Sequence, residues 1–218
     1  MRACALTFLV ATIGASISCA ASRSWWNPPA CRFEPVSTDD LPGDLALRAR
    51  SRFDVRGETI GVELVARARP DGLVVLGLSG YGVRLFAVEQ RGQELAIDGS
   101  SREDRALASF AMDALHRAFW IRPPAEAASP AQAGQSWQWG GERVSQTSSG
   151  AGARLRYESE GNSEAVTIDY PEPVSVGDSE AASQQTVVVR NPRCGYEAVI
   201  IPLSVTSSGW NRAPAASD

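Results

Sequence analysis

Residues 102–120, REDRALASFAMDALHRAFW, form the one strongly amphipathic segment with helical spacing in this chain. Ser101 is a candidate N-cap, with Asp104 three residues later as a loose capping box, and Pro123-Pro124 ends the segment. We therefore predict a single helix with His116 on its polar, solvated side. Its apolar stripe follows i, i+3, i+4 spacing and comprises Ala106, Leu107, Phe110, Ala111, Ala114, Leu115, Ala118 and Phe119.

Strand patterns both precede and follow the predicted helix in the sequence. Apolar and polar residues alternate along most of these segments, and turn chemistry such as Pro70-Asp71-Gly72 and Arg91-Gly92 separates those before it. The predicted fold is mainly β (α+β): a curved antiparallel sheet or incomplete β-barrel with one amphipathic helix as a lid. A gap between lid and sheet would form an apolar cavity. The predicted strands cover residues 59–68, 73–78, 83–90, 94–97, 136–139, 142–146, 153–159, 164–170, 185–191 and 196–203.

The length, composition and net charge of the chain exclude some classes of function. A chain of 218 residues with 44% hydrophobic and 21% charged residues suits one globular domain. A net charge of −4 is of the wrong sign for a general nucleic-acid binder. Lysine is absent, which excludes a lysine nucleophile or Schiff base.

The N-terminus has the layout of a secretory signal peptide. Arg2 precedes an apolar run over residues 5–15, and small residues follow. The sequence Ser16-Ile17-Ser18-Cys19 is similar to a bacterial lipobox, although Leu is usual where Ser16 stands, and Cys19 would then be lipidated. The competing cleavage, after Ala20, would release a soluble secreted protein. We predict a signal peptide in 1–19, a tether in 20–44, one domain in 45–204 and a disordered tail in 205–218.

Two cysteines remain after export. Cys31 lies in the predicted tether and Cys194 near the end of the predicted domain, and an oxidising compartment favours a disulfide between them. Two Cys and one His do not make a usual structural zinc site, so no metal and no cofactor is expected.

No enzyme motif emerges. A Ser-His-Asp arrangement would have to use His116, the only histidine. The segment Gly77-Leu78-Ser79-Gly80 lacks the second glycine of a nucleophile elbow, because Tyr81 stands there. We therefore expect a protein without catalytic residues.

The central segment LGLSGYGVRLF (76–86), then Gly92, then Ala118-Phe119-Trp120, resembles an uncharacterised family of bacterial lipoproteins related to LolB. The late strands at 165–170 and 195–201 fit the same pattern. The resemblance covers residues 45–204 and implies a strongly curved half-barrel with a helical lid over an apolar cavity. LolB accepts acylated lipoproteins from a periplasmic carrier and places them in the outer membrane. Its loop-tip residue, which helps the transfer, matches Tyr81 here.

The expected function is therefore that of an outer-membrane lipoprotein, facing the periplasm, that binds an acyl chain or lipid and assists lipoprotein or lipid placement. Expected partners are a lipid or acyl chain, the membrane through the anchor, and a periplasmic carrier protein, but no nucleic acid. The alternative is a structural or interaction lipoprotein with a filled core and a protein partner; an open cavity of at least ~300 Å³ favours carriage over it. The expected cavity lining is Leu64, Leu76, Leu85, Phe110, Leu115, Leu155, Ile168 and Ile200.

Overall fold

A computed structural model describes residues 35–40, 44–69, 71–120, 133–139, 141–149, 152–161, 164–171 and 186–208. Within them, eleven strands form one sheet in the order β5-β4-β3-β2-β1-β11-β10-β9-β8-β7-β6. A short helix η1 (Thr38–Asp40) precedes the sheet, and α1 (Arg102–Leu115) continues into a π-helical turn, η2 (His116–Trp120). The strands are β1 (Asp44–Val55), β2 (Glu58–Arg69), β3 (Gly72–Leu78), β4 (Arg84–Arg91), β5 (Glu94–Gly99), β6 (Ser136–Trp139), β7 (Glu142–Ser149), β8 (Gly152–Ser159), β9 (Val166–Tyr170), β10 (Val187–Asn191) and β11 (Tyr196–Ser208).

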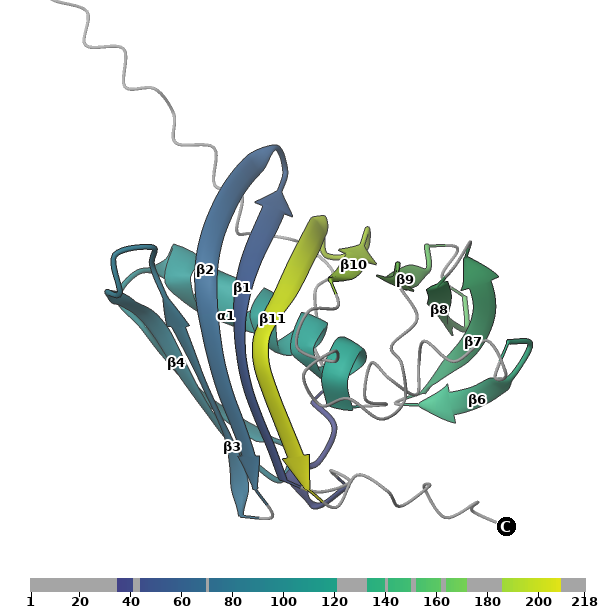
Figure 1. Ribbon diagram of the computed structural model, residues 1–218, viewed down its shortest axis with the longest axis horizontal. Coiled ribbons are helices and arrows are strands. Elements are labelled where there is room, and N and C mark those ends of the chain that lie inside the picture. Colours follow the sequence, from purple (N-terminus) through teal and green to yellow (C-terminus); the bar gives the residue numbers. More distant parts are fainter. Residues whose placement is uncertain are drawn as a thin grey trace, which may run out of the picture.

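The sheet is antiparallel and stays open. Its first half, β5 to β1, and its second half, β11 to β6, each follow chain order, and they join where β1 pairs with β11. The outermost strands β5 and β6 do not pair with each other. The sheet curves, and α1 runs along its concave side (Figure 1). The predicted half-barrel with one helix is thereby confirmed.

Alternating burial along the strands defines the two faces. In β1, every second residue from Leu45 to Val55 is buried, and the intervening residues are mostly exposed. β2, β3, β8 and β9 repeat this pattern of period two. One face therefore packs on α1 and forms the core, whereas the other face is exposed to solvent.

Two register shifts interrupt the pairing. One lies opposite Arg48/Ala49, where Leu203 is the extra residue in β11, and the other lies opposite Gly77/Leu78, where Leu85 is the extra residue in β4. Such bulges bend the strand that carries them and increase its twist. They help the sheet to curve around the helix.

The predicted start of the helix is confirmed. Ser101 Oγ accepts a hydrogen bond from the Asp104 backbone N–H at 3.0 Å, and the Asp104 carboxylate accepts one from the Ser101 N–H at 3.0 Å. This capping box satisfies two of the backbone donors that a helix N-terminus leaves unpaired. None of the helices in the described residues is long and apolar enough to cross a bilayer.

Three expectations need correction. His116 is fully buried rather than solvated, because the C-terminal half of α1 is enclosed on all sides. Part of the predicted tether, 35–40, packs on the domain: the Thr38 N–H donates to Gly92 O at 3.1 Å, and the Gly92 N–H donates to Thr38 Oγ1 at 2.8 Å. Strand β11 continues to Ser208, past the predicted end at 204, because it pairs with the start of β1. The rest of the predicted tail lies outside the described residues.

Gly77 is predicted to be essential for this packing. A Cβ at Gly77 would lie 2.3 Å from the ring of Phe86, which is fully buried in the cross-strand position. Gly77→Val should therefore lower the free energy of unfolding by about 1–3 kcal/mol or more, measured by urea denaturation. Gly61→Val is the matched control, since a Cβ there meets nothing within 4 Å. Equal losses in both variants would contradict this account.

Candidate functional site

The concave interior is where the expected cavity lining would act. Six of the eight residues point into it and are fully buried or nearly so, contributed by β2, α1, β8, β9 and β11. They are packed in the continuous hydrophobic core, so their contact with a ligand stays a prediction. The six are Leu64, Phe110, Leu115, Leu155, Ile168 and Ile200.

The other two expected lining residues lie elsewhere. Leu76 is half-buried on the convex face, because Leu73 and Val75 are the inward residues of β3. The run 73–78 is apolar at almost every position. No alternation of apolar and polar residues therefore shows which of its side chains face the core. Leu85 is the bulge residue of β4 and is half-buried against the edge of the core.

Side chains fill the space between α1 and the strands that pair at the centre of the sheet. The ring of Phe110 lies 5.1 Å from that of Tyr196, and Tyr196 lies 6.3 Å from Phe53, measured between centroids. Leu64, Met112 and Leu115 are fully buried in the same core. In this conformation, the described concave side is therefore an apolar core.

A buried polar cluster interrupts this core at the C-terminal end of α1. We define it as Asp113, Arg117, Glu142, Tyr157, Asn191, Arg193 and Tyr196. Asp113, which is 2% exposed, accepts hydrogen bonds from Tyr196 Oη at 2.6 Å, Asn191 Nδ2 at 2.7 Å and Arg117 Nε at 2.7 Å. One helical carboxylate is thereby bound to both strands of the β10–β11 hairpin.

Two arginines continue the cluster toward β7 and β8. Arg117 Nη1 donates to Glu142 Oε2 at 2.5 Å, and Arg193 Nη1 donates to Glu142 Oε1 and to Ser159 Oγ. Arg193 Nε also donates to Glu164 O at 2.6 Å. Two carboxylates and two guanidinium groups balance one another, which offsets much of the cost of burying each charge.

The cluster changes the proton affinity of its members. Burial alone would lower the pKa of Arg117, but the charges of Asp113 and Glu142 outweigh it and raise that pKa. Burial, followed by the nearby Asp113 charge, raises the pKa of Tyr196 well above its usual value. Both side chains therefore stay protonated, and both donate hydrogen bonds within the cluster.

Two tyrosines hold the π-helical turn η2. Tyr157 Oη donates to Arg117 O at 3.1 Å, and Tyr170 Oη donates to Ala118 O at 2.9 Å. The guanidinium of Arg117 lies 4.9 Å from the Tyr157 ring centroid, within cation–π range. The end of the helix is thus bound to β8 and β9 as well as to the β10–β11 hairpin.

His116 connects the helix with the N-terminal segment. Its Nε2 lies 2.9 Å from Gln90 Oε1, and Gln90 Nε2 donates to Val36 O at 2.6 Å and to Gly92 O at 2.7 Å. Because the Gln90 amide group donates elsewhere, His116 Nε2 must carry the proton. The geometry around His116 is therefore that of a structural hydrogen-bond relay.

The polar cluster is not among the features predicted from the sequence. One signal was present: residues 106–112 carry no charge around the whole helix, which indicates burial on more than one side. The partners Asn191, Arg193 and Glu142 carry no local pattern, because they meet Asp113 and Arg117 only through the sheet order.

The expected loop tip is exposed. The loop between β3 and β4 is closed by the Ser79 N–H, which donates to Val83 O at 2.8 Å, and by the Gly82 N–H, which donates to Ser79 O at 2.8 Å. Tyr81 at its tip is 96% exposed and Val83 is 62% exposed. The predicted hairpin is thus present, and its two apolar residues project into solvent.

The remaining sequence predictions concern cysteines and metals. Cys19 and Cys31 lie outside the described residues, so lipidation and the disulfide stay predictions. Cys194 is buried in the β10–β11 turn, where its N–H donates to Asn191 Oδ1 at 3.1 Å. In the described ranges, no group of three or more His, Cys, Asp or Glu residues is placed to hold a metal ion.

Removing Asp113 should destabilise the fold strongly. Asp113→Ala leaves Tyr196, Asn191 and Arg117 buried without their shared acceptor, and we expect a loss of about 3–5 kcal/mol in the free energy of unfolding. Asp98→Ala is the control, because the Arg84–Asp98 pair is 60% and 69% exposed and such pairs contribute about 0–1 kcal/mol. A loss for Asp113→Ala as small as that of the control would contradict the role of the cluster.

His116 should make stability depend on pH. Burial, with a smaller effect of the Arg117 charge, lowers the pKa of His116 to about 3 from 6.5. The folded state therefore favours neutral His116, and this contribution is full above pH 6.5 and is lost as the pH falls toward 3. At ~1.4 kcal/mol per pH unit, the advantage of wild type over His116→Gln should shrink by about 3 kcal/mol between pH 7.5 and 4.5. A constant difference would contradict a buried neutral imidazole.

This chain is similar to a solved structure in its fold and to one protein family in its sequence. A solved structure from Vibrio parahaemolyticus, described as a domain with a proposed role as an outer membrane lipoprotein-sorting protein, is similar with a TM-score of 0.35 and 9% identity. The match covers 78% of this chain and 88% of that chain; it concerns the fold alone, and nothing about function follows from it. No curated protein matches the chain. The sequence profile of an uncharacterised family matches residues 46–204, and this chain belongs to that family, described as "Protein of unknown function (DUF3261)".

Proposed function

We propose that this protein is a non-enzymatic envelope lipoprotein that takes up an acyl chain between its sheet and α1, and so assists lipid or lipoprotein placement. The observation that supports this proposal best is the architecture of the concave side. Strands from both ends of the chain line it with apolar residues, and a single helix covers it. An acyl chain needs such a surface and no catalytic group.

Entry of an acyl chain requires α1 to move. The N-terminal half of α1 is buried against the described sheet, so the chain must replace contacts that Leu107, Ala108 and Phe110 now make. Burial of each methylene contributes about 0.8 kcal/mol, so a chain with ~14 methylenes gains about 11 kcal/mol. This gain is large enough to offset the loss of several helix side-chain contacts.

The polar cluster holds the C-terminal end of α1 in place during such a movement. The C-terminal end of α1 and η2 are bound to β7, β8, β9 and the β10–β11 hairpin. At the other end, α1 follows β5, which is an edge strand, after a short connection. A movement of only the N-terminal half of α1 together with β5, at the open edge of the sheet, leaves Asp113 and the rest of the cluster in place.

The exposed loop between β3 and β4 is the proposed contact with the membrane. Tyr81 and Val83 are exposed, and Arg84 follows them at the start of β4. A tyrosine is favoured at the interface of a bilayer, and an adjacent arginine attracts anionic lipids. The anchor at Cys19, a periplasmic carrier as partner and the outer-membrane location facing the periplasm belong to the same proposal.

A second candidate function rests on the filled core. An interaction lipoprotein would use the same fold without opening it, and its partner would be a protein. The packing of Phe53, Phe110 and Tyr196 favours this function, because these buried rings lie next to one another between helix and sheet. The two functions differ in whether an acyl chain ever reaches the concave side.

Photo-crosslinking distinguishes them. The full chain, expressed with its own N-terminal segment, is incubated with a diazirine-bearing palmitate, irradiated and mapped by mass spectrometry. Uptake predicts crosslinks to inward residues such as Leu64, Phe110 and Leu155, and their loss with excess unlabelled palmitate. Labelling confined to convex residues, or none, would exclude carriage and leave the interaction reading. The same sample gives the intact mass, which shows whether Cys19 carries lipid.

The loop tip is tested separately. Tyr81→Ala should leave the free energy of unfolding within about 0.5 kcal/mol, because the side chain is 96% exposed. It should slow the transfer of a fluorescent fatty acid from the protein to phospholipid vesicles several-fold. Tyr81→Trp should restore transfer, since indole is also favoured at the interface. An unchanged rate in Tyr81→Ala would remove the membrane role of this loop.

A further inference from the structure

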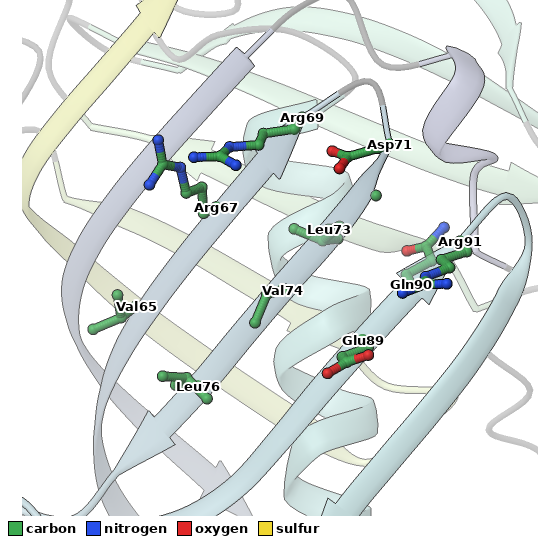
Figure 2. A pocket seen from close by; sticks show the side chains of 11 residues that line it. Val65, Arg67, Arg69, Asp71, Leu73, Val74, Leu76, Glu89, Gln90 and Arg91 are labelled. Atoms are coloured by element: carbon green, nitrogen blue, oxygen red, sulfur yellow. The ribbon is translucent and has the colours of Figure 1, made fainter.

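A groove crosses the convex face, on the side of the sheet opposite α1. It lies over β2, β3 and β4 and has a volume of about 410 Å³ (Figure 2). Its floor is apolar and consists of Val65, Val74 and Leu76, with Val74 44% exposed. Arg67 and Arg69 stand on one side and Asp71 and Glu89 on the other, with Arg91 two residues beyond Glu89 in β4.

The strand register sets these groups in ordered rows. Val74 of β3 pairs with Arg67 of β2 and with Glu89 of β4. These three residues therefore form a row across the strands, with a cation, an apolar residue and an anion in that order. Since neighbouring strands lie about 4.8 Å apart, the two charged residues start about 10 Å apart, above Val74. The next row places Leu76 beside Val65.

A glycine deepens the groove at its end. Gly72 pairs with Arg69, and a Cβ there would meet Gln90 O at 2.8 Å and Arg91 Cγ at 3.6 Å. Without a side chain at Gly72, the space between Arg69 and Arg91 stays open. The cationic side of the groove is therefore accessible along its length.

On the described convex face some arginines are paired with carboxylates, whereas others, such as Arg50 and the arginines of the groove, are not. Arg48, Arg52, Arg154 and Arg190 each lie within ion-pair distance of a carboxylate. Among the residues that the structure describes, Arg67 and Arg69 have no such carboxylate, and neither Asp71 nor Glu89 has a cation. Both signs of charge are thus available to a ligand across one apolar floor.

We propose that this groove binds the head group of a zwitterionic, amine-bearing phospholipid at the membrane surface. Arg67 and Arg69 bind its phosphate, and Glu89 with Asp71 binds its ammonium group. Val74 and Leu76 contact the carbon atoms between the charges and the start of the acyl chains. A purely anionic head group would face the two carboxylates, and a quaternary amine would lack the N–H donors that a carboxylate accepts. This site is independent of acyl uptake, since the groove lies on the opposite face.

Short-chain lipids below their micelle concentration test the proposal. Dihexanoyl-phosphatidylethanolamine is titrated into the ¹⁵N-labelled full chain, with the phosphatidylglycerol and phosphatidylcholine analogues in parallel. We expect shifts of the β2, β3 and β4 amides with the ethanolamine lipid, and weaker binding of the other two. Arg67→Gln and Glu89→Gln should each raise the apparent Kd about tenfold. Arg154→Gln, on the convex face of the second half, is the matched control and should leave it unchanged.

Each outcome decides the assignment. Thermal unfolding of the three variants confirms that the exposed substitutions leave the fold intact. Tighter binding of phosphatidylglycerol, or a Kd that depends on Arg67 but not on Glu89, would overturn the assignment to a zwitterionic head group and indicate a simple anion site. Shifts spread over both faces, or equal effects of Arg154→Gln and Arg67→Gln, would overturn it as well. Crosslinking of palmitate on the concave side is unaffected by any of these results.

Discussion

The burial of α1 on the concave side of an open sheet is the interaction on which this structure depends. An antiparallel sheet whose edges β5 and β6 stay apart has one apolar face that must be covered. The helix covers it with Phe110, Met112 and Leu115, and the β1–β11 pairing brings the first and last described strands under the same helix. The fold, the core and the proposed acyl site are thus three aspects of one surface.

The polar cluster determines how the helix is held. Asp113 accepts hydrogen bonds from the β10–β11 hairpin, Arg117 donates to Glu142 of β7, and two tyrosines bind η2 to β8 and β9. A buried network of this kind fixes one arrangement, because a shift of the helix would leave charges unpaired in the core. The helix end is therefore rigid, whereas its start depends on apolar contacts and on an edge strand. This asymmetry is what makes a lid of α1 physically reasonable.

Local pattern was enough to predict most of the fold. Periodicity identified α1, the capping box at Ser101 and nearly all the strands, because each depends on neighbours in sequence. It failed where the environment comes from distant segments. Leu76 faces outward within a run that is apolar at almost every position, and the buried His116 meets Gln90 of β4, which is distant in sequence. The cluster around Asp113 and the convex groove arise only from the sheet order, so no local pattern could place them.

Hydrogen–deuterium exchange of the full chain, with and without bound palmitate, tests the central claim most directly. Because α1 is buried against the described concave side, an acyl chain that enters beneath the helix must displace contacts that the helix now makes. We expect faster exchange in the N-terminal half of α1, residues 102–110, when palmitate is bound, with the amides of residues 111–115, β1, β2 and η2 still protected. Palmitate that binds while α1 exchanges as slowly as before, or more slowly, would contradict a helix that moves to admit the chain.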